Sequence, residues 1–286
     1  MRENKSAVLN RFFSRNTFRD IIDSTDDEIY KSVILRYVKN PENKKNVELI
    51  SEIYTELKKN YRNEYYYKNT LLNKLLLGVH SINTTVALTE IPISKSKADF
   101  VLINGKAIAY EIKTELDNLD RLENQINDYY KAFDHVSVIT CKENLALLEN
   151  KLEIINKPIG IYVLQNNGSL SIIQKPLKYS DSLDKNIIFK ILRKSEYESI
   201  IMQVYGELPQ VTQFKYYSEC LNLFLKVDLD KVYELFIAQL KKRTKVEKEL
   251  YQNVPYELKF LTYFMDLKEA DYSRLNSFLY NQFGGM

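Results

Sequence analysis

Two acidic residues and one lysine lie on two neighbouring predicted strands. Asp99 opens one apolar run, and Glu111 and Lys113 end the next. Asn104-Gly105 separates the runs and predicts a β-hairpin, because both residues tolerate positive φ. Paired carboxylates can hold a hard cation such as Mg²⁺, and a nearby amine can orient water or stabilise charge on a phosphate. The pattern therefore suits metal-assisted cleavage of a phosphodiester.

The position of Asp99 relative to Glu111 depends on the turn between the strands. A two-residue turn pairs Ile103 with Lys106, which sets Asp99 opposite Tyr110 and puts the two acids on different faces. A bulge or a longer turn would bring the acids together. The sequence leaves these registers open, together with the plainer alternative of a salt-bridged hairpin that has no site.

The stretch from Asp99 to Lys113 resembles the PD-(D/E)XK nuclease motif, with Ala98 in place of the proline. The following helix carries Gln125-Ile-Asn-Asp-Tyr129, which resembles the QxxxY motif of the RecB-like branch. Over about residues 61–175 the chain resembles the sce7726 family of bacterial PD-(D/E)XK-like proteins. This resemblance implies an α/β fold with a restriction-endonuclease-like αβββαβ core. It also implies a Mg²⁺- or Mn²⁺-dependent nuclease, a hydrolase that acts on ester bonds in nucleic acid, with DNA favoured over RNA, in a mobile-element or phage-defence context.

The resemblance also assigns roles to particular residues. It implies that Asp99, Glu111 and Glu90 bind the metal, that Lys113 assists the attacking water, and that Gln125 completes the catalytic group. A catalytically inactive module of the same fold, which binds nucleic acid or protein, is the alternative from another functional class.

Tyr129, Glu90 and Glu64 are supporting candidates with plainer interpretations. Tyr129 is also consistent with a core aromatic, and Glu90 with a surface acid at the end of a strand. Glu64 is also consistent with an acid near a helix start, where the macrodipole favours it.

Hydrophobic periodicity predicts the elements around these residues. It predicts helices over 61–78 and 119–133, the second with Asp117 or Asn118 as its N-cap. The predicted strands cover 84–91, 136–139, 159–164 and 170–173, in addition to the hairpin. The chain should therefore divide into a helical N-terminal segment, 1–60, a core, 61–175, and a helical C-terminal region, 176–286.

Composition limits the functional classes. The 286 residues are 45% hydrophobic, and no apolar run of 18 residues or signal peptide is evident, so a cytoplasmic protein without a membrane partner is expected. Two cysteines, two histidines and no Walker or GxGxxG motif argue against zinc and nucleotide sites. A formal charge of +3 is weakly basic, so nucleic-acid binding would rely on local patches such as 241–245, which are also consistent with solvated helix faces. The helical ends could serve a homo-oligomer or a protein partner.

Overall fold

The computed structural model describes residues 3–23, 28–79, 82–243 and 246–284. The chain forms two compact units, one of residues 1–82 together with 245–286 and the other of residues 83–244. The first unit thus combines the two ends of the chain. The predicted division at residues 60 and 175 follows the helical and strand patterns along the sequence and stays a prediction.

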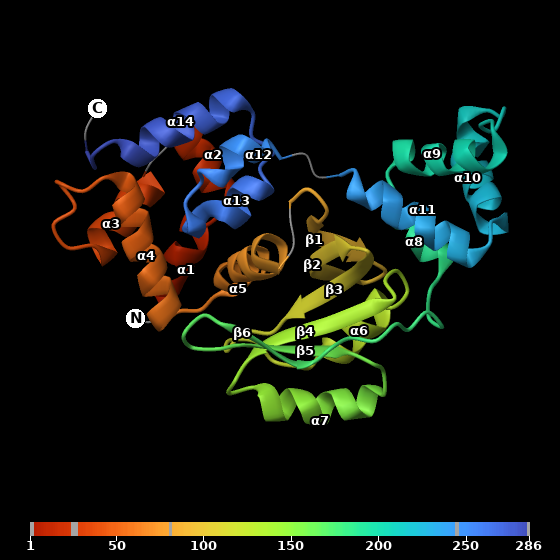
Figure 1. Ribbon diagram of the computed structural model, residues 1–286, viewed down its shortest axis with the longest axis horizontal. Helices are drawn as coiled ribbons and strands as arrows, with labels where there is room; N and C mark the ends of the chain where they lie inside the picture. Colours follow the sequence, from red (N-terminus) through yellow and green to blue (C-terminus); the bar gives the residue numbers. More distant parts are fainter. Residues whose placement is uncertain (1–2, 24–27, 80–81, 244–245, 285–286) are drawn as a thin grey trace. The chain divides into compact units, whose positions relative to one another are not determined.

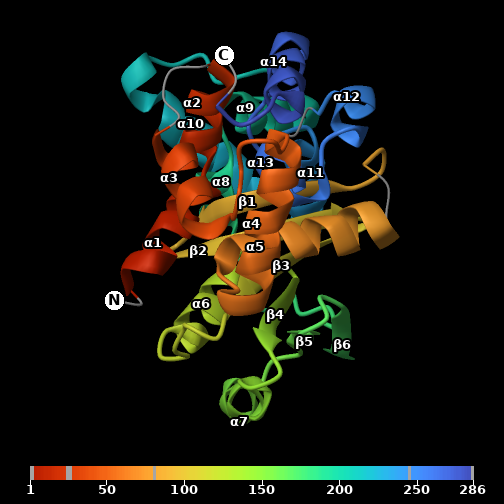
Figure 2. The same cartoon turned by 90° about the vertical axis from the view of Figure 1, so that its left-hand side faces the viewer.

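The named elements of the first unit, among its described residues, are all helices (Figure 2). Aromatic rings fill its interior, and the ring of Phe13 stacks on that of Tyr65 at 4.6 Å between centroids. Asp271 accepts hydrogen bonds from Arg19 and Arg274, which ties the C-terminal segment to the N-terminal helices. The elements are α1 (Glu3–Phe12), α2 (Arg15–Asp23), α3 (Glu28–Tyr37), α4 (Asn46–Asn60), α5 (Glu64–Leu71), the π-helix η1 (Leu72–Val79), α12 (Lys248–Gln252), the 3₁₀ helix η2 (Tyr256–Leu258), α13 (Lys259–Tyr263) and α14 (Glu269–Tyr280).

The second unit is built on a six-stranded mixed sheet whose strand order follows the chain (Figure 1). The strands are β1 (Val86–Ile93), β2 (Ser96–Asn104), β3 (Lys106–Ile112), β4 (His135–Cys141), β5 (Gly160–Leu164) and β6 (Leu170–Gln174). Strands β1 to β3 form an antiparallel meander, β4 and β5 run parallel to β3, and β6 returns antiparallel. Each parallel step needs a crossover, which the helices α6 (Leu122–Tyr129) and α7 (Leu145–Ile155) supply.

The core of this unit lies between the sheet and its crossover helices. Val101, Ala109 and Val138 alternate onto one face of the sheet and are buried in the same cluster as Ile126 of α6 and Leu148 of α7. Figure 1 shows α7 beside the part of the sheet that contains β4 and β5. The remaining helices of the unit are α8 (Lys185–Ile191), α9 (Lys194–Tyr205), α10 (Gln213–Lys226) and α11 (Leu229–Lys241).

The prediction of a mixed α/β chain with helical N- and C-terminal regions is confirmed. The strands and the β5–β6 hairpin lie where periodicity predicts them, within about two residues at most ends. Strand β1 continues through Pro92, which an edge strand tolerates because its N–H is not needed for the ladder. In the described part of the chain, no helix is both long and apolar enough to cross a bilayer.

Two predicted helices differ in detail. The helix expected over 61–78 begins at Glu64, where Asn63 caps it by accepting a hydrogen bond from the Tyr66 N–H, and it becomes a π-helix after Leu71. The helix expected over 119–133 covers only Leu122–Tyr129, and Arg121 occupies its N-cap position.

The prediction of Asp117 or Asn118 as the N-cap is wrong. Asp117 instead accepts hydrogen bonds from the N–H and hydroxyl of Thr114, at 2.8 and 2.7 Å, and so fixes the turn after β3. Asn118 accepts a hydrogen bond from the Asp120 N–H in the same connection. Short polar side chains satisfy nearby backbone groups in turns as readily as at helix starts.

Candidate functional site

The β2–β3 hairpin sets the two predicted acids opposite each other. Asn104 pairs with Lys106, with Gly105 alone between them at φ 69°, and the ladder continues to Phe100 paired with Tyr110. One step further along, Asp99 lies across from Glu111. The expected pairing of Asp99 with Tyr110 is therefore wrong, because a turn centred on a single glycine at positive φ shifts the register by one residue.

Glu90 extends this arrangement to a third strand. The pairs Thr89 with Phe100 and Ile91 with Ala98 flank Glu90 and Asp99, so these two acids also lie across from each other. A carboxylate oxygen of Glu90 lies within 4.8 Å of one of Asp99. We call Glu90, Asp99 and Glu111 the acidic row.

The backbone of Glu90 adopts an unusual conformation. Its φ is 56°, a left-handed value that costs a residue with a Cβ roughly 1–2 kcal/mol. Its carboxylate pairs with the exposed Lys97 ammonium on β2 at 3.2 Å. The strain is located at the predicted site, in an otherwise regular edge strand.

Glu111 lies at the closed end of the row and is surrounded by hydrogen-bond donors. Its Oε1 accepts from Gln125 Nε2 at 2.5 Å and pairs with Lys113 Nζ at 2.9 Å, while its Oε2 accepts from the Tyr129 hydroxyl. Lys113 Nζ also donates to Gln125 Oε1 at 2.9 Å. Gln125 and Tyr129 lie one turn apart on α6, as their spacing predicts, and both reach β3.

Burial determines the electrostatics of this group. Glu111 is 2% exposed and Lys113 is 5% exposed. Burial raises the pKa of the Glu111 carboxyl, and Lys113, Tyr129 and Gln125 offset that effect only in part. Burial and the neighbouring Glu111 carboxylate raise the pKa of the Tyr129 hydroxyl far above its ordinary value, so Tyr129 stays a neutral donor.

Asp99 joins the row to the backbone of β3. Its Oδ2 accepts a hydrogen bond from the Ile112 N–H at 2.8 Å, and its carbonyl oxygen accepts one from the Thr89 hydroxyl at 2.8 Å. The Asp99 carboxylate thus accepts a hydrogen bond that a backbone carbonyl would accept in a regular β-ladder, just beyond the last β2–β3 pair. Asp99 is half-buried, whereas Glu90 is exposed, so the row opens to solvent at the β1 edge.

Sequence reasoning missed the role of Asp128, which lies between Gln125 and Tyr129. Its Oδ2 accepts hydrogen bonds from the Lys95 N–H at 3.2 Å and the Ser96 hydroxyl at 2.7 Å, in the β1–β2 turn. Although burial raises its pKa, these bonds and those from Lys131 prevail, and the pKa lies below its usual range. The sequence did contain a signal for this role. Asp128 follows Gln125 by three residues, and on a helix this spacing also directs its side chain toward the sheet.

Two other predicted features have ion-pair partners within their own units. Glu64 belongs to the first unit, at the first position of α5, where its carboxylate pairs with Lys68 at 2.6 Å. In the basic run 241–245, residues 244 and 245 lie outside the described part of the chain. Arg243 donates to both carboxylate oxygens of the buried Glu196 and to the Ile191 carbonyl. Arg243 therefore serves the interior of the second unit.

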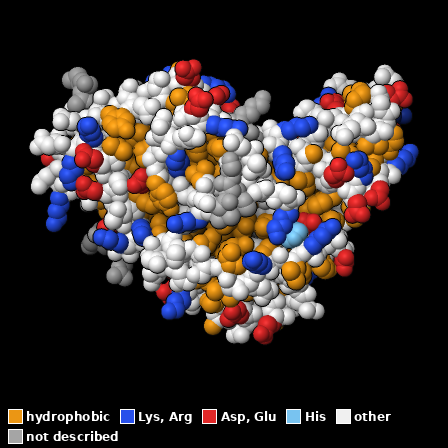
Figure 3. Space-filling view, in the orientation of Figure 1, with side chains coloured by type: hydrophobic (Ala, Val, Ile, Leu, Met, Phe, Trp, Pro, Cys, Tyr) orange, Lys and Arg blue, Asp and Glu red, His pale blue; other side chains and the backbone are white. Residues whose placement is uncertain are grey.

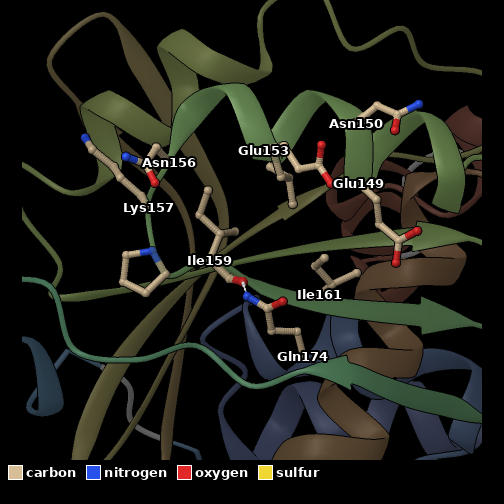
Figure 4. Close-up of a pocket in the computed structure, with 10 residues that line it drawn as sticks. Glu149, Asn150, Glu153, Asn156, Lys157, Ile159, Ile161 and Gln174 are labelled. Carbon is tan, nitrogen blue, oxygen red and sulfur yellow. Dashed lines mark hydrogen bonds between the residues drawn. The ribbon is translucent and has the colours of Figure 1, made fainter.

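A separate cavity of about 780 Å³ lies beside α7 (Figure 4). Glu149 and Glu153 of α7 line one side, Lys157 one end and Ile161 the floor, and Gln174 donates a hydrogen bond to the Ile159 carbonyl across it. The acidic row contributes no residue to this cavity, which offers acids on α7 that can serve as controls.

Comparison with known proteins decides the family. The model of the family of bacteriophage P4 protein cII matches residues 57–260, which is well over half of the chain. The chain belongs to this family. A curated relative, protein cII of Enterobacteria phage P4, is 28% identical over 152 residues, which cover 51% of this chain and 54% of that protein. The chain thus spans about half the length of the relative that it matches. No solved structure matches the chain.

The cII family overturns the expected assignment. The predicted membership of the sce7726 family is wrong, because the family model that matches the chain is that of protein cII, and no nuclease family was identified. The nuclease function and the phage-defence context rested on that resemblance and are wrong with it. The geometry of the acidic row is independent of the family, and catalysis by these residues stays a prediction.

Proposed function

We propose that the acidic row binds a divalent cation, Mg²⁺ or Mn²⁺, and that the chain uses this cation to bind phosphate groups of nucleic acid. The observation that carries the proposal is the register, which sets acids of three adjacent strands side by side. Lys113 pairs with Glu111 at the buried end of the row, and Lys97 pairs with Glu90 at the exposed end. Three carboxylates gathered on adjacent strands repel one another, and a bound cation would offset that repulsion.

The donor set fits a hard cation. Glu90 and Asp99 approach each other at the open end, and Mg²⁺ needs only one or two protein carboxylates when water and phosphate oxygens fill its other positions. Glu111 turns both oxygens to Gln125, Lys113 and Tyr129. We therefore assign the cation to Glu90 and Asp99, and regard Glu111 as a positioning residue.

Charges around the row support a phosphate-bearing partner. Lys95 and Lys97 are exposed in the β1–β2 hairpin, next to the two acids that we assign to the cation. Lysines and a bound divalent cation together compensate the charge of adjacent phosphates along a nucleic-acid strand. DNA is the partner that we propose first, with RNA as the comparison in the test.

We also propose a more specific fold for the second unit, that of a restriction-endonuclease-like core. The antiparallel meander β1–β3, the crossover through α6 and the parallel strand β4 follow the strand–strand–strand–helix–strand part of a restriction-endonuclease-like core. The helix that would precede this part is α5, which belongs to the first compact unit.

The experiment measures Mn²⁺ binding by calorimetry and by paramagnetic resonance of the free ion. We expect Asp99→Asn and Glu90→Gln to weaken Mn²⁺ binding by at least about tenfold. The matched control is Glu149→Gln on α7, which removes an acid that lines the separate cavity and should leave affinity unchanged. Equal binding by the wild type and Asp99→Asn would contradict the cation site.

Nucleic-acid binding is tested separately by fluorescence anisotropy of labelled DNA and RNA oligonucleotides. We expect Mn²⁺ to increase DNA affinity for the wild type but not for Asp99→Asn. Lys97→Gln should weaken DNA binding and flatten its dependence on salt. If Mn²⁺ binds at the row and DNA affinity is unaffected by it, the cation site stands and the nucleic-acid role is refuted.

A further inference from the structure

Two ion pairs at the two ends of the acidic row differ in their exposure. At the buried end, the side chains of Lys113 and Glu111 are 7% and 2% exposed. At the open end, the side chains of Lys97 and Glu90 are 58% and 41% exposed, and 3.2 Å separates Lys97 Nζ from Glu90 Oε2. Water screens an exposed pair, so Glu90 holds the Lys97 ammonium only weakly, whereas the buried pair is costly to break.

The strand register brings Lys97 to Glu90. Lys97 precedes Asp99 by two residues on β2, so both side chains point to the same face of the sheet. The cross-strand partner of Lys97 is Pro92, two residues after Glu90 on β1. Lys97 is therefore a diagonal neighbour of Glu90, and such a neighbour lies within reach of a long side chain. Its ammonium pairs with one of the two carboxylates that we assign to the cation.

The backbone of Lys97 is fixed although its ammonium is exposed. The Tyr129 hydroxyl, which donates to Glu111, also shares a hydrogen bond with the Lys97 carbonyl oxygen at 2.7 Å. The four-carbon stem of a lysine is flexible, so the ammonium can move without any change in the strand. Lys97 can therefore leave Glu90 while the carboxylates of the row stay in register.

Charge makes the Lys97 ammonium and a divalent cation competitors. A cation held by Glu90 and Asp99 would lie close to the ammonium that pairs with Glu90, and the two positive charges would repel each other. A cation with two charges attracts the carboxylates more strongly than an ammonium with one, and an exposed pair is easily broken. Cation binding should therefore displace the Lys97 ammonium from Glu90.

The displaced ammonium would have a role in phosphate binding. Figure 3 shows basic side chains dispersed among acidic and apolar ones, and the formal net charge of the chain is only +3. A weak and dispersed charge makes phosphate binding depend on local groups. Once it has left Glu90, Lys97 can pair with a phosphate beside the bound cation, because the phosphate attracts both positive charges.

We propose that Lys97 is an exchangeable occupant of the cation site: a divalent cation displaces its ammonium from Glu90, and the displaced ammonium then binds phosphate. This inference rests on the cation site proposed above and adds the coupling between the cation and nucleic acid. Because such coupling is reciprocal, DNA should raise the affinity for the cation by the same factor as the cation raises the affinity for DNA.

Mn²⁺ titration by calorimetry tests the exchange on the full chain. We expect Lys97→Met to tighten Mn²⁺ binding by about two- to fivefold, because the variant lacks the competing ammonium. The matched control is Lys95→Met, which removes an exposed lysine from the turn of the same hairpin and keeps the Lys97–Glu90 pair. Lys97→Arg, which retains the positive charge, should bind Mn²⁺ like the wild type. A gain below about 1.5-fold for Lys97→Met, or an equal gain for Lys95→Met, overturns the exchange.

Fluorescence anisotropy with a labelled DNA oligonucleotide tests the second half of the proposal. Lys97→Met should weaken DNA binding by at least about threefold when Mn²⁺ is saturating and by less than about 1.5-fold without it, because Glu90 holds the ammonium in the absence of the cation. Lys95→Met should weaken DNA binding equally in both conditions. An equal loss for Lys97→Met with and without Mn²⁺ overturns the proposal.

The outcome for Asp99→Asn separates this inference from the cation site. If Asp99→Asn weakens Mn²⁺ binding and Lys97→Met does not tighten it, the site stands and the exchange fails. If Asp99→Asn leaves Mn²⁺ binding unchanged, the cation site fails, and the exchange fails with it.

Discussion

Removal of the Lys113 ammonium should destabilise the second unit by about 3–4 kcal/mol. Lys113 is the cation that faces the Glu111 carboxylate at 2.9 Å, and both side chains are buried. Breaking a buried pair costs roughly 3–5 kcal/mol, because the remaining charge is left uncompensated. Glu111 can escape by binding a proton, which at pH 7 costs about 3.7 kcal/mol for a carboxyl whose ordinary pKa is near 4.3. The smaller of these costs limits the effect of Lys113→Met.

Urea unfolding followed by far-ultraviolet circular dichroism measures the change, since the chain has no tryptophan. Lys231→Met is the matched control. It removes an exposed lysine that pairs with Glu234 at 3.0 Å and should cost less than about 1 kcal/mol. The double variant Lys113→Met with Glu111→Gln should cost less than the sum of the single variants by at least about 1 kcal/mol. A loss below about 1 kcal/mol for Lys113→Met, or strict additivity, would refute the description of this pair as a coupled buried interaction.

Three further predictions concern the supports of the site and of the second unit. Glu90→Gly should raise the thermal stability by up to about 1 kcal/mol, because glycine relieves the left-handed backbone, whereas Glu90→Ala should bring no such gain; a less stable glycine variant would contradict the strain. Asp128→Ala should cost about 1–3 kcal/mol and speed hydrogen exchange of the Lys95 amide, because the β1–β2 turn loses its acceptor; unchanged exchange would exclude Asp128 as the anchor. Burial alone raises the pKa of Glu196, but hydrogen bonds from Arg243 outweigh it and hold the pKa below its ordinary value of 4.5. The stabilisation from Glu196 is thus present above that value and lost as the pH falls through the lowered pKa, so Glu196→Gln should flatten the acid limb of a stability profile.

Local patterns predicted the elements of the site, because each depends on residues close in sequence. Asn104-Gly105 predicted the hairpin, and the spacing of Gln125 and Tyr129 predicted that both lie on one face of a helix. The register could not be predicted, since a shift by one residue changes the face of every side chain on a strand, and the turn alone decides it. The turn closes around Gly105 alone, and this detail placed Asp99 opposite Glu111.

Features that depend on distant residues left no local signal. Arg19 and Asp271 are 252 positions apart, yet their hydrogen bond joins the two ends of the chain in one unit. The supporting role predicted for Glu64 relied on resemblance to a fold. Within its own unit, the Glu64 carboxylate forms an ion pair with Lys68, one helical turn away. The family assignment failed for a related reason: short acidic motifs on strands recur in many proteins, so they describe a geometry better than an ancestry.

The two ends of the acidic row differ in their surroundings and in their roles. At the closed end, three donors fill both oxygens of Glu111, so this carboxylate is committed to holding β3 against α6. Next to it, the Ile112 N–H holds Asp99 in place, so the position of Asp99 depends on the strand that Glu111 anchors. At the open end, Glu90 is strained and exposed, and its carboxylate pairs with Lys97. In the cation site that we propose, this strain would hold Glu90 opposite Asp99 for a shared ligand, and the buried end would supply the rigidity that keeps the two acids in register.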